Sequence, residues 1–121
     1  MANEITISNS VDYDKNDEQD QFSSGNQTVD VAGDHYKKGI QTIGFAAAEA
    51  IEKGDVVTVG WCRFKNLDAT NFVLIGYDDT GFKHLLKLLP GEAQVVRLSQ
   101  STPQAQADTG AVLLAYTIYE E

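Results

Sequence analysis

Alternating apolar and polar residues predict a series of short β-strands in the chain beyond Gly39. The clearest pattern is VVTVGWCRF, residues 56–64, which directly follows the turn signal EKGD. β-Branched and aromatic residues that alternate in this way are typical of strands that bury one face. The C-terminal sequence AVLLAYTIYEE predicts a long core strand, whose shared face carries Val112, Leu114, Tyr116 and Ile118.

Two segments allow more than one interpretation. AAAEAIEK, residues 46–53, is interpreted as a strand end followed by a turn, with a short helix as the alternative. FKHLLKLL, residues 82–89, has its apolar residues at helical spacing, but the preceding Gly81 and the following Pro90 favour a strand. Pro90 and Gly91 fit the centre of a type II turn, so we expect AQVVRL to be the return strand of a hairpin.

The first 39 residues differ in composition from the rest. Asp, Asn, Ser, Gln and Gly dominate residues 9–39, and only residues 5–7 and 28–31 resemble strands. One interpretation is a disordered tail, because a polar acidic segment buries too little apolar area to offset its ordering entropy. The other is an ordered arm that packs along its own sheet or a neighbouring subunit, which the β-prone islands favour. We therefore predict a polar N-terminal arm over residues 1–39 and a folded domain over residues 40–121.

The spacing of the strands indicates the fold class. SQSTPQAQADTG, residues 99–110, reads as a polar loop. The remaining pattern gives about seven or eight short strands separated by regular turns, which is typical of sandwiches and jelly rolls. The prediction is an all-β, single-domain antiparallel β-sandwich or jelly-roll-like fold.

One predicted strand, NFVLIGY at residues 71–77, is apolar on both faces. In a two-sheet sandwich only one face of each sheet reaches the core. A second apolar face therefore predicts a second buried surface, and contact between subunits is the simplest source of it. The candidate oligomer or partner interface consists of Phe72, Val73, Leu74, Ile75 and Tyr77.

Charge and cysteine content restrict the function. The net charge of −9 and the scattered positions of the nine basic residues argue against binding to nucleic acid or to an acidic membrane. The single cysteine, Cys62, excludes an intramolecular disulfide and a cysteine-based zinc site. Because Cys62 lies in an alternating apolar stretch, we expect a packed thiol.

An acidic segment near the N-terminus resembles the start of a calcium loop. Asp12, Asp14 and Asn16 alternate as in an EF-hand. Asp17, however, stands where the loop requires glycine, and Ser23 where it requires the bidentate glutamate. We interpret the segment as a solvated acidic loop and predict no metal or other cofactor.

The sequence contains no nucleophile–base pair, phosphate loop or metal-ligand motif, so we do not expect an enzyme. Trp61, Tyr77, Tyr116 and Tyr119 could together form an aromatic platform for a sugar. A tryptophan packed in the core is the preferred interpretation.

Three stretches carry a resemblance to a known group of proteins. They are GDVVTVGWCRFKNLDATNFVLIG, LLKLLPGEAQVVRL and AQADTGAVLLAYTIYEE. Their order resembles small β-sandwich proteins of tailed bacteriophages, which carry the pattern GW…NLD-TN-V-IG…L-PGE…RL. The resemblance covers roughly Gln41 to Glu121 and includes no reactive residue.

The resemblance implies a structural protein of the virion, made in the host cytoplasm. A capsid decoration or cement protein is the leading expectation, one that forms homo-oligomers, with a trimer as the first guess, and binds the major capsid protein. A component of the neck or tail is an alternative. A carbohydrate-binding module for host surface glycans is the alternative from a different class.

Overall fold

The computed structural model describes residues 4–99 and 102–121, and the chain divides into two compact units, one ending at Ala32 and the other beginning at Gly33. Every regular element in the described residues is a β-strand, so the predicted all-β class is confirmed and the helical alternatives are wrong. The division falls before Gly33 rather than after Gly39. The reason is that the strand Tyr36–Ile43 (β3) pairs with the C-terminal strand of the second unit.

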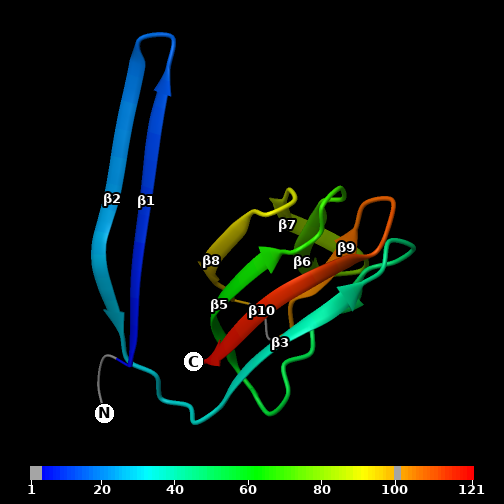
Figure 1. The fold of residues 1–121 in the computed structure, drawn as a ribbon. Helices are drawn as coiled ribbons and strands as arrows, with labels where there is room; N and C mark the ends of the chain where they lie inside the picture. The colour runs from blue at the N-terminus through cyan, green and yellow to red at the C-terminus, as the bar shows by residue number, and fades with distance from the viewer. Residues whose placement is uncertain (1–3, 100–101) are drawn as a thin grey trace. The chain divides into compact units, whose positions relative to one another are not determined.

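The first unit is an antiparallel hairpin of β1 (Ile5–Lys15) and β2 (Glu18–Val29) (Figure 1). Asn16 and Asp17 connect the strands with φ angles of 52° and 66°. Two consecutive residues with positive φ make a type I′ turn, whose twist matches that of the flanking strands. The strands are longer than the islands expected at residues 5–7 and 28–31, because polar residues that pair across a hairpin leave little trace in hydropathy.

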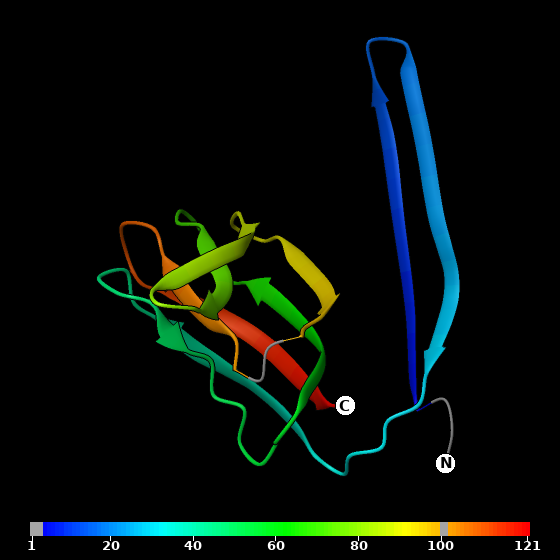
Figure 2. The same cartoon turned by 180° about the vertical axis from the view of Figure 1, so that it is seen from behind.

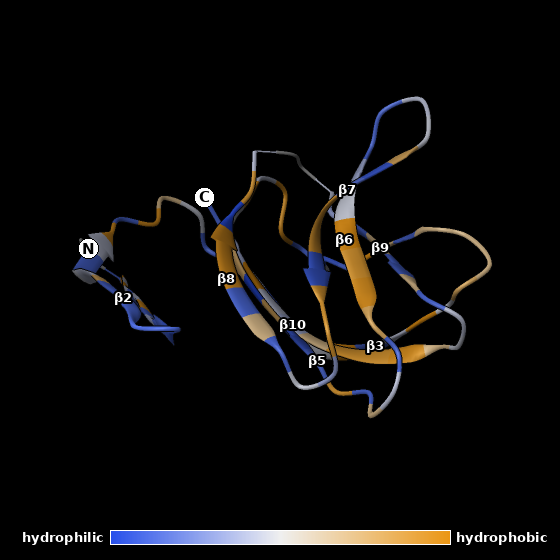
Figure 3. Cartoon of the chain, turned by 90° about the horizontal axis from the view of Figure 1, so that it is seen from above, coloured by the Kyte–Doolittle hydropathy of each residue, from blue (hydrophilic) through white to orange (hydrophobic). Residues whose placement is uncertain are grey.

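The second unit contains two four-stranded antiparallel sheets. Figure 3 shows them as separate layers, and Figure 2 views the unit from the side of the second sheet. In spatial order, the first sheet consists of β3 (Tyr36–Ile43), β10 (Val112–Glu120), β5 (Val59–Asn66) and β8 (Ala93–Arg97). The second consists of β4 (Glu49–Ala50), β9 (Gln104–Ala107), β6 (Val73–Asp78) and β7 (Phe82–Leu88).

A single hydrophobic cluster fills the space between the two sheets. The first sheet contributes Phe64 and Ile118, and the second contributes Val73 and Ile75, all at most 1% exposed. Burying one side chain of this size stabilises the fold by about 1.5–3 kcal/mol. The four alternate residues predicted to share the core face of the last strand are all buried, so that part of the prediction is confirmed.

The turn at residues 89–92 forms as predicted and a strand follows it, but this strand does not pair as predicted. Gly91 has a φ of 82°, and the N–H of Glu92 donates to the carbonyl of Leu89 at 2.9 Å, as in a type II turn. β8 pairs with β5 of the first sheet and not with β7, so the predicted hairpin is wrong. The N–H of Gly91 donates to the carbonyl of Asn66, and the N–H of Asn66 donates to the carbonyl of Glu92. These two bonds join the turn to the end of β5, where the chain crosses between sheets.

The predicted polar loop at residues 99–110 contains a strand in its described part. β9 lies between β4 and β6, with Ala105 and Ala107 buried and the intervening glutamines turned outward. Residues 100 and 101 lie outside the described residues. The segment at residues 46–53 contains a bend and the short strand β4, and the segment at residues 82–88 is a strand, as the flanking glycine and proline indicated.

Candidate interaction site

The structure separates the residues predicted to form an interface. Val73 and Ile75 are at most 1% exposed and lie in the core, so they are not available to a partner. Phe72, Leu74 and Tyr77 are only half-buried. The ammonium of Lys87 lies 4.4 Å from the centre of the Phe72 ring, so this unit itself covers part of the surplus apolar surface.

A larger apolar surface lies on the outer side of the first sheet. Tyr36 and Ile40 on β3 are 67% and 64% exposed, and Leu113 on β10 is 48% exposed. Ile40 is directly opposite Ala115, whose small side chain leaves a depression in the middle of this face. Of these residues, Ile40 and Ala115 line a shallow hollow over β10 and β5, together with Val95 on β8.

The same surface is basic in a strongly acidic protein. Thr117 in the centre of β10 pairs with Lys38 on one side and Arg63 on the other, and Ala115 pairs with Lys65. The Nε of Arg63 donates to the hydroxyl of Thr117 at 3.1 Å. None of the outward-facing residues in these four strands is acidic. We call the surface formed by Lys38, Ile40, Arg63, Lys65 and Val95 the basic face.

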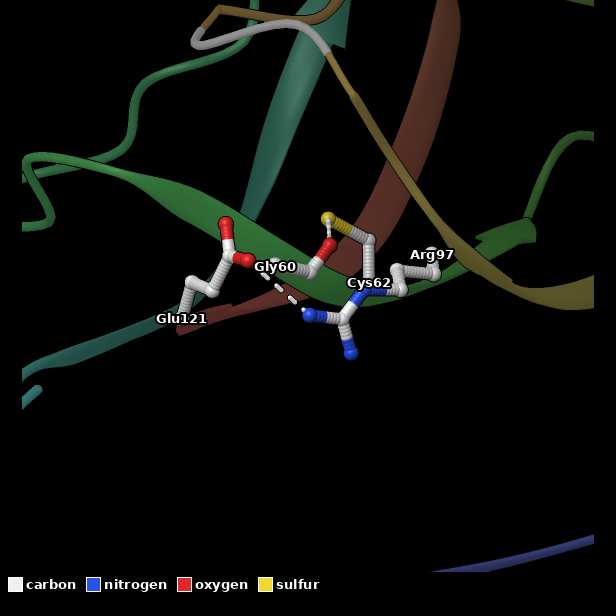
Figure 4. A network of polar contacts seen from close by, with 4 residues as sticks. All are labelled: Gly60, Cys62, Arg97 and Glu121. Atoms are coloured by element: carbon white, nitrogen blue, oxygen red, sulfur yellow. Dashed lines mark hydrogen bonds and ion pairs between the residues drawn. The ribbon is translucent and has the colours of Figure 1, made fainter. Parts of the chain in front are cut away.

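One further cation at the end of this sheet is already paired. Arg97 on β8 lies 3.0 Å from the carboxylate of Glu121, as Figure 4 shows. Nearby, the buried thiol of Cys62 donates to the carbonyl of Gly60 at 3.7 Å. Burial raises the pKa of the Cys62 thiol to about 12, so this sulfur stays protonated and unreactive. The positive charge of the basic face therefore comes from Lys38, Arg63 and Lys65.

Asn66 and Asp68, two residues of the sequence pattern NLD-TN, form a network of hydrogen bonds at the connection between the sheets, which we call a polar lock. Asn66 is 0% exposed, and its Nδ2 donates to the carbonyls of Asn71 at 2.9 Å and Leu88 at 3.0 Å. Its Oδ1 accepts the N–H of Asp68 at 2.8 Å. The carboxylate of Asp68 accepts the N–H groups of Asn71 and Thr70, which lower the pKa of Asp68. Asn66 and Asp68 therefore have a structural role: their polar atoms form hydrogen bonds with backbone groups, and we do not assign them to a reaction.

A second polar lock holds the start of the second unit to its last strand. The carboxylate of Glu120 accepts the N–H of Val57 at 2.7 Å and that of Asp34 at 3.0 Å. These hydrogen bonds lower the pKa of Glu120, and the bond from Val57 has the largest effect. A Cβ at position 33 would overlap the Glu120 side chain, so any residue larger than glycine would require this side chain to move. The N–H of Gly33 donates to the carbonyl of Glu121 at 3.1 Å.

The hairpin β1–β2 has two chemically different faces. On one side, Val11 is directly opposite Phe22, and Tyr13 shares the same face. Ile5, Ile7 and Val29 continue this face towards the base of the hairpin. On the other side, paired positions carry only Ser, Thr, Asn, Gln and Asp. Val11, Tyr13 and Phe22 are 56%, 47% and 55% exposed, so the apolar face is open near the tip.

Other candidate sites from the sequence are dispersed. Asp12 and Asp14 lie within β1, and no group of three or more His, Cys, Asp or Glu among residues 4–99 and 102–121 is arranged to hold a metal. Tyr116 is 4% exposed in the core, so the four aromatic residues considered for sugar binding do not form one platform. No helix in the described part of the chain is long and apolar enough to cross a membrane.

Comparison with family models, with curated proteins and with solved structures finds no match to this chain. The surfaces described above therefore carry the functional argument.

The apolar face of the hairpin had a signal in the sequence, whereas the basic face had none. Ile5, Ile7, Val11 and Tyr13 all occupy odd positions, and the Asn16–Asp17 pair marks the turn that brings β2 against them. Prediction of the basic face from the sequence would have required the strand order, because its cations come from β3 and β5, which lie on either side of β10.

Proposed function

We propose that this chain is a structural assembly protein that forms homo-oligomers and binds other protein surfaces. The observation that carries the proposal is the hairpin β1–β2, with its exposed apolar face of Val11, Tyr13 and Phe22. An isolated two-stranded hairpin is marginally stable in water. Removing apolar surface from water contributes about 25 cal/mol per Å². A protein surface that covers this face would therefore stabilise the hairpin, which acts as an N-terminal arm.

Within this class we propose a structural component of a tailed-phage virion that decorates the capsid shell and binds the major capsid protein. The pattern over residues 41–121 supports this proposal, as does the antiparallel arrangement of two sheets around one core. A trimer is the proposed oligomer, because quasi-threefold positions are common on capsids. A position on the neck or tail is the alternative within the same class.

The position on a particle can be tested directly. Antibodies against the folded protein should label the heads of intact particles in immunogold electron microscopy. Labelling confined to the neck or tail would replace the capsid proposal with its alternative. Particles without any label, although the lysate contains the protein, would contradict a role in the virion.

A carbohydrate-binding module is the second candidate, and one aromatic pair favours it. Tyr36 and Tyr119 stack with ring centroids 6.4 Å apart, and Tyr36 is 67% exposed. Exposed aromatic rings bind the apolar faces of sugars. Glycan binding that is lost in Tyr36→Ala would support this function, whereas a glycan array without any bound protein would argue against it.

A further inference from the structure

We propose that the basic face of one copy receives the β1–β2 hairpin of a second copy. The inference rests on the proposed assembly function and specifies which two surfaces meet. Two independent properties of these surfaces, charge and apolar content, support the match. A third, the length of the connection between the two units, favours a second copy over the same chain.

The charges of the two surfaces are complementary. Residues 4–32 contain seven acidic residues and a single basic residue, Lys15. Asp20, opposite Tyr13, and Glu18, opposite Lys15, share the apolar face of the hairpin, whereas Asp12 and Asp14 are on its polar face. The basic face carries Lys38, Arg63 and Lys65 without an acidic residue among the outward positions of its strands. Opposite potentials of this kind accelerate encounter and select the orientation of two partners.

The apolar parts of the two surfaces are also complementary. Phe22, Val11 and Tyr13 form a ridge of large exposed side chains on the hairpin. The basic face has a hollow floored by Ala115 and bordered by the exposed side chain of Ile40. Aromatic residues that fill a pocket are typical of the centres of stable interfaces.

The short connection between the units argues for a second copy. The N–H of Val31 donates to the carboxylate of Glu4 at the base of the hairpin, and the N–H of Gly33 is bonded to Glu121. Only Ala32 lies between these anchored residues. Phe22 lies about 30 Å along β2 from Val31, at about 3.3 Å per residue. Ala115, the floor of the hollow, lies about 20 Å along β10 from Glu121 at the same rise per residue, so an arm laid along its own sheet would carry its apolar ridge about 10 Å beyond the hollow.

Two variants of the full-length chain separate the surfaces. The face variant combines Lys38→Glu with Lys65→Glu, two exposed lysines whose exchange leaves the core unchanged. The hairpin variant combines Tyr13→Ser with Phe22→Ser, both exposed positions. Lys83→Glu on β7 of the other sheet is the matched control for charge reversal. Circular dichroism checks that each variant keeps its fold.

Sedimentation velocity over a wide concentration range gives the result. We expect the self-association constant of each double variant to be lower than that of the natural chain by a factor on the order of ten or more. Lys83→Glu should associate as strongly as the natural chain. An equal mixture of the two variants should regain association, because one intact hairpin then meets one intact basic face. High salt should weaken the association of the natural chain.

Three results would overturn the inference. If the natural chain associates but the mixture of variants does not, the oligomer uses another contact; the inference fails while the assembly function stands. If the variants associate as strongly as the natural chain, the conclusion is the same. If the natural chain stays monomeric and the amides of β1 and β2 are protected at every concentration, the hairpin docks on its own chain. Immunogold labelling of particles does not depend on this contact, so it tests the proposed function separately.

Discussion

Replacement of Asn66 by alanine tests whether the lock between the sheets stabilises the fold. The side chain is 0% exposed and makes three hydrogen bonds: two through its amide group and one through its carbonyl oxygen. A hydrogen bond contributes about 1 kcal/mol net, and a buried carbonyl left without a donor costs more. The carbonyl of Leu88 is such a group. The expected loss in the free energy of unfolding is therefore about 3–4 kcal/mol, a large fraction of the total stability of a domain.

Urea unfolding followed by the fluorescence of Trp61 measures this loss. Protein concentration must be equal for all variants, because self-association adds to apparent stability. In thermal unfolding the same change should lower the Tm by about 12–30 °C, since a unit of this size loses about 4–8 °C per kcal/mol. Asn66→Asp should cost at least as much, because a carboxylate accepts hydrogen bonds and cannot donate to the two carbonyls.

Asn71→Ala is the matched control for this experiment. Its side chain accepts an exposed hydrogen bond from Thr109, and the backbone carbonyl that Asn66 uses stays in place. We expect this variant to lose less than about 1 kcal/mol. The reasoning would be refuted if Asn66→Ala lost no more than the control while the denaturant dependence of the unfolding free energy stayed unchanged.

Three further predictions concern single side chains. Gly76→Ala should destabilise the protein by about 1–3 kcal/mol in urea unfolding, because its Cβ would overlap the backbone of Lys83, whereas Gly39→Ala, with its nearest neighbour at 3.6 Å, should be neutral. Glu120→Gln should lower the urea midpoint of unfolding at neutral pH. Folding lowers the pKa of Glu120, so the carboxylate stabilises the protein above its unfolded pKa, and this contribution is lost as the pH falls through its folded pKa. Equal urea midpoints for the variant and the natural chain at all pH values would contradict this prediction. An NMR titration should find the pKa of Asp68 below its ordinary value, and an ordinary value would show that its backbone hydrogen bonds do not form in solution.

Local features of the sequence were sufficient for several strands of the second unit and for one turn. The alternating residues of β10 lie on the core face because a strand with one apolar side has only one stable orientation against a second sheet. Pro90 and Gly91 form their turn because each has the backbone preference that its position requires. Gly81 and Pro90 also outweighed the helical spacing of the segment between them, which forms β7.

Pairing between distant segments could not be read in the same way. β8 follows β7 directly in the sequence, but it pairs with β5. The reason is that the turn between β7 and β8 is hydrogen-bonded to Asn66 at the end of β5. β9 has only alanine on its buried face, so its sequence QAQA resembles a polar loop. The hairpin β1–β2 has few apolar residues in each strand, and only pairing gathers them on one face. In each case the missing information is the identity of the neighbouring strand.

The residues of the pattern NLD-TN-V-IG…L-PGE and the residues of the proposed contact surfaces have different roles in the structure. Asn66, Asp68 and Glu92 all bind backbone groups of their own unit, and Gly76 gives β7 room to approach. These residues stabilise the connections between the two sheets of this unit. The exposed apolar side chains of the hairpin and the two lysines of the basic face do not bind backbone groups in this way, and Arg63 donates only to the side chain of Thr117. Specificity for a partner should therefore change with residues 4–32 and with Lys38, Arg63 and Lys65, while the pattern residues stay the same.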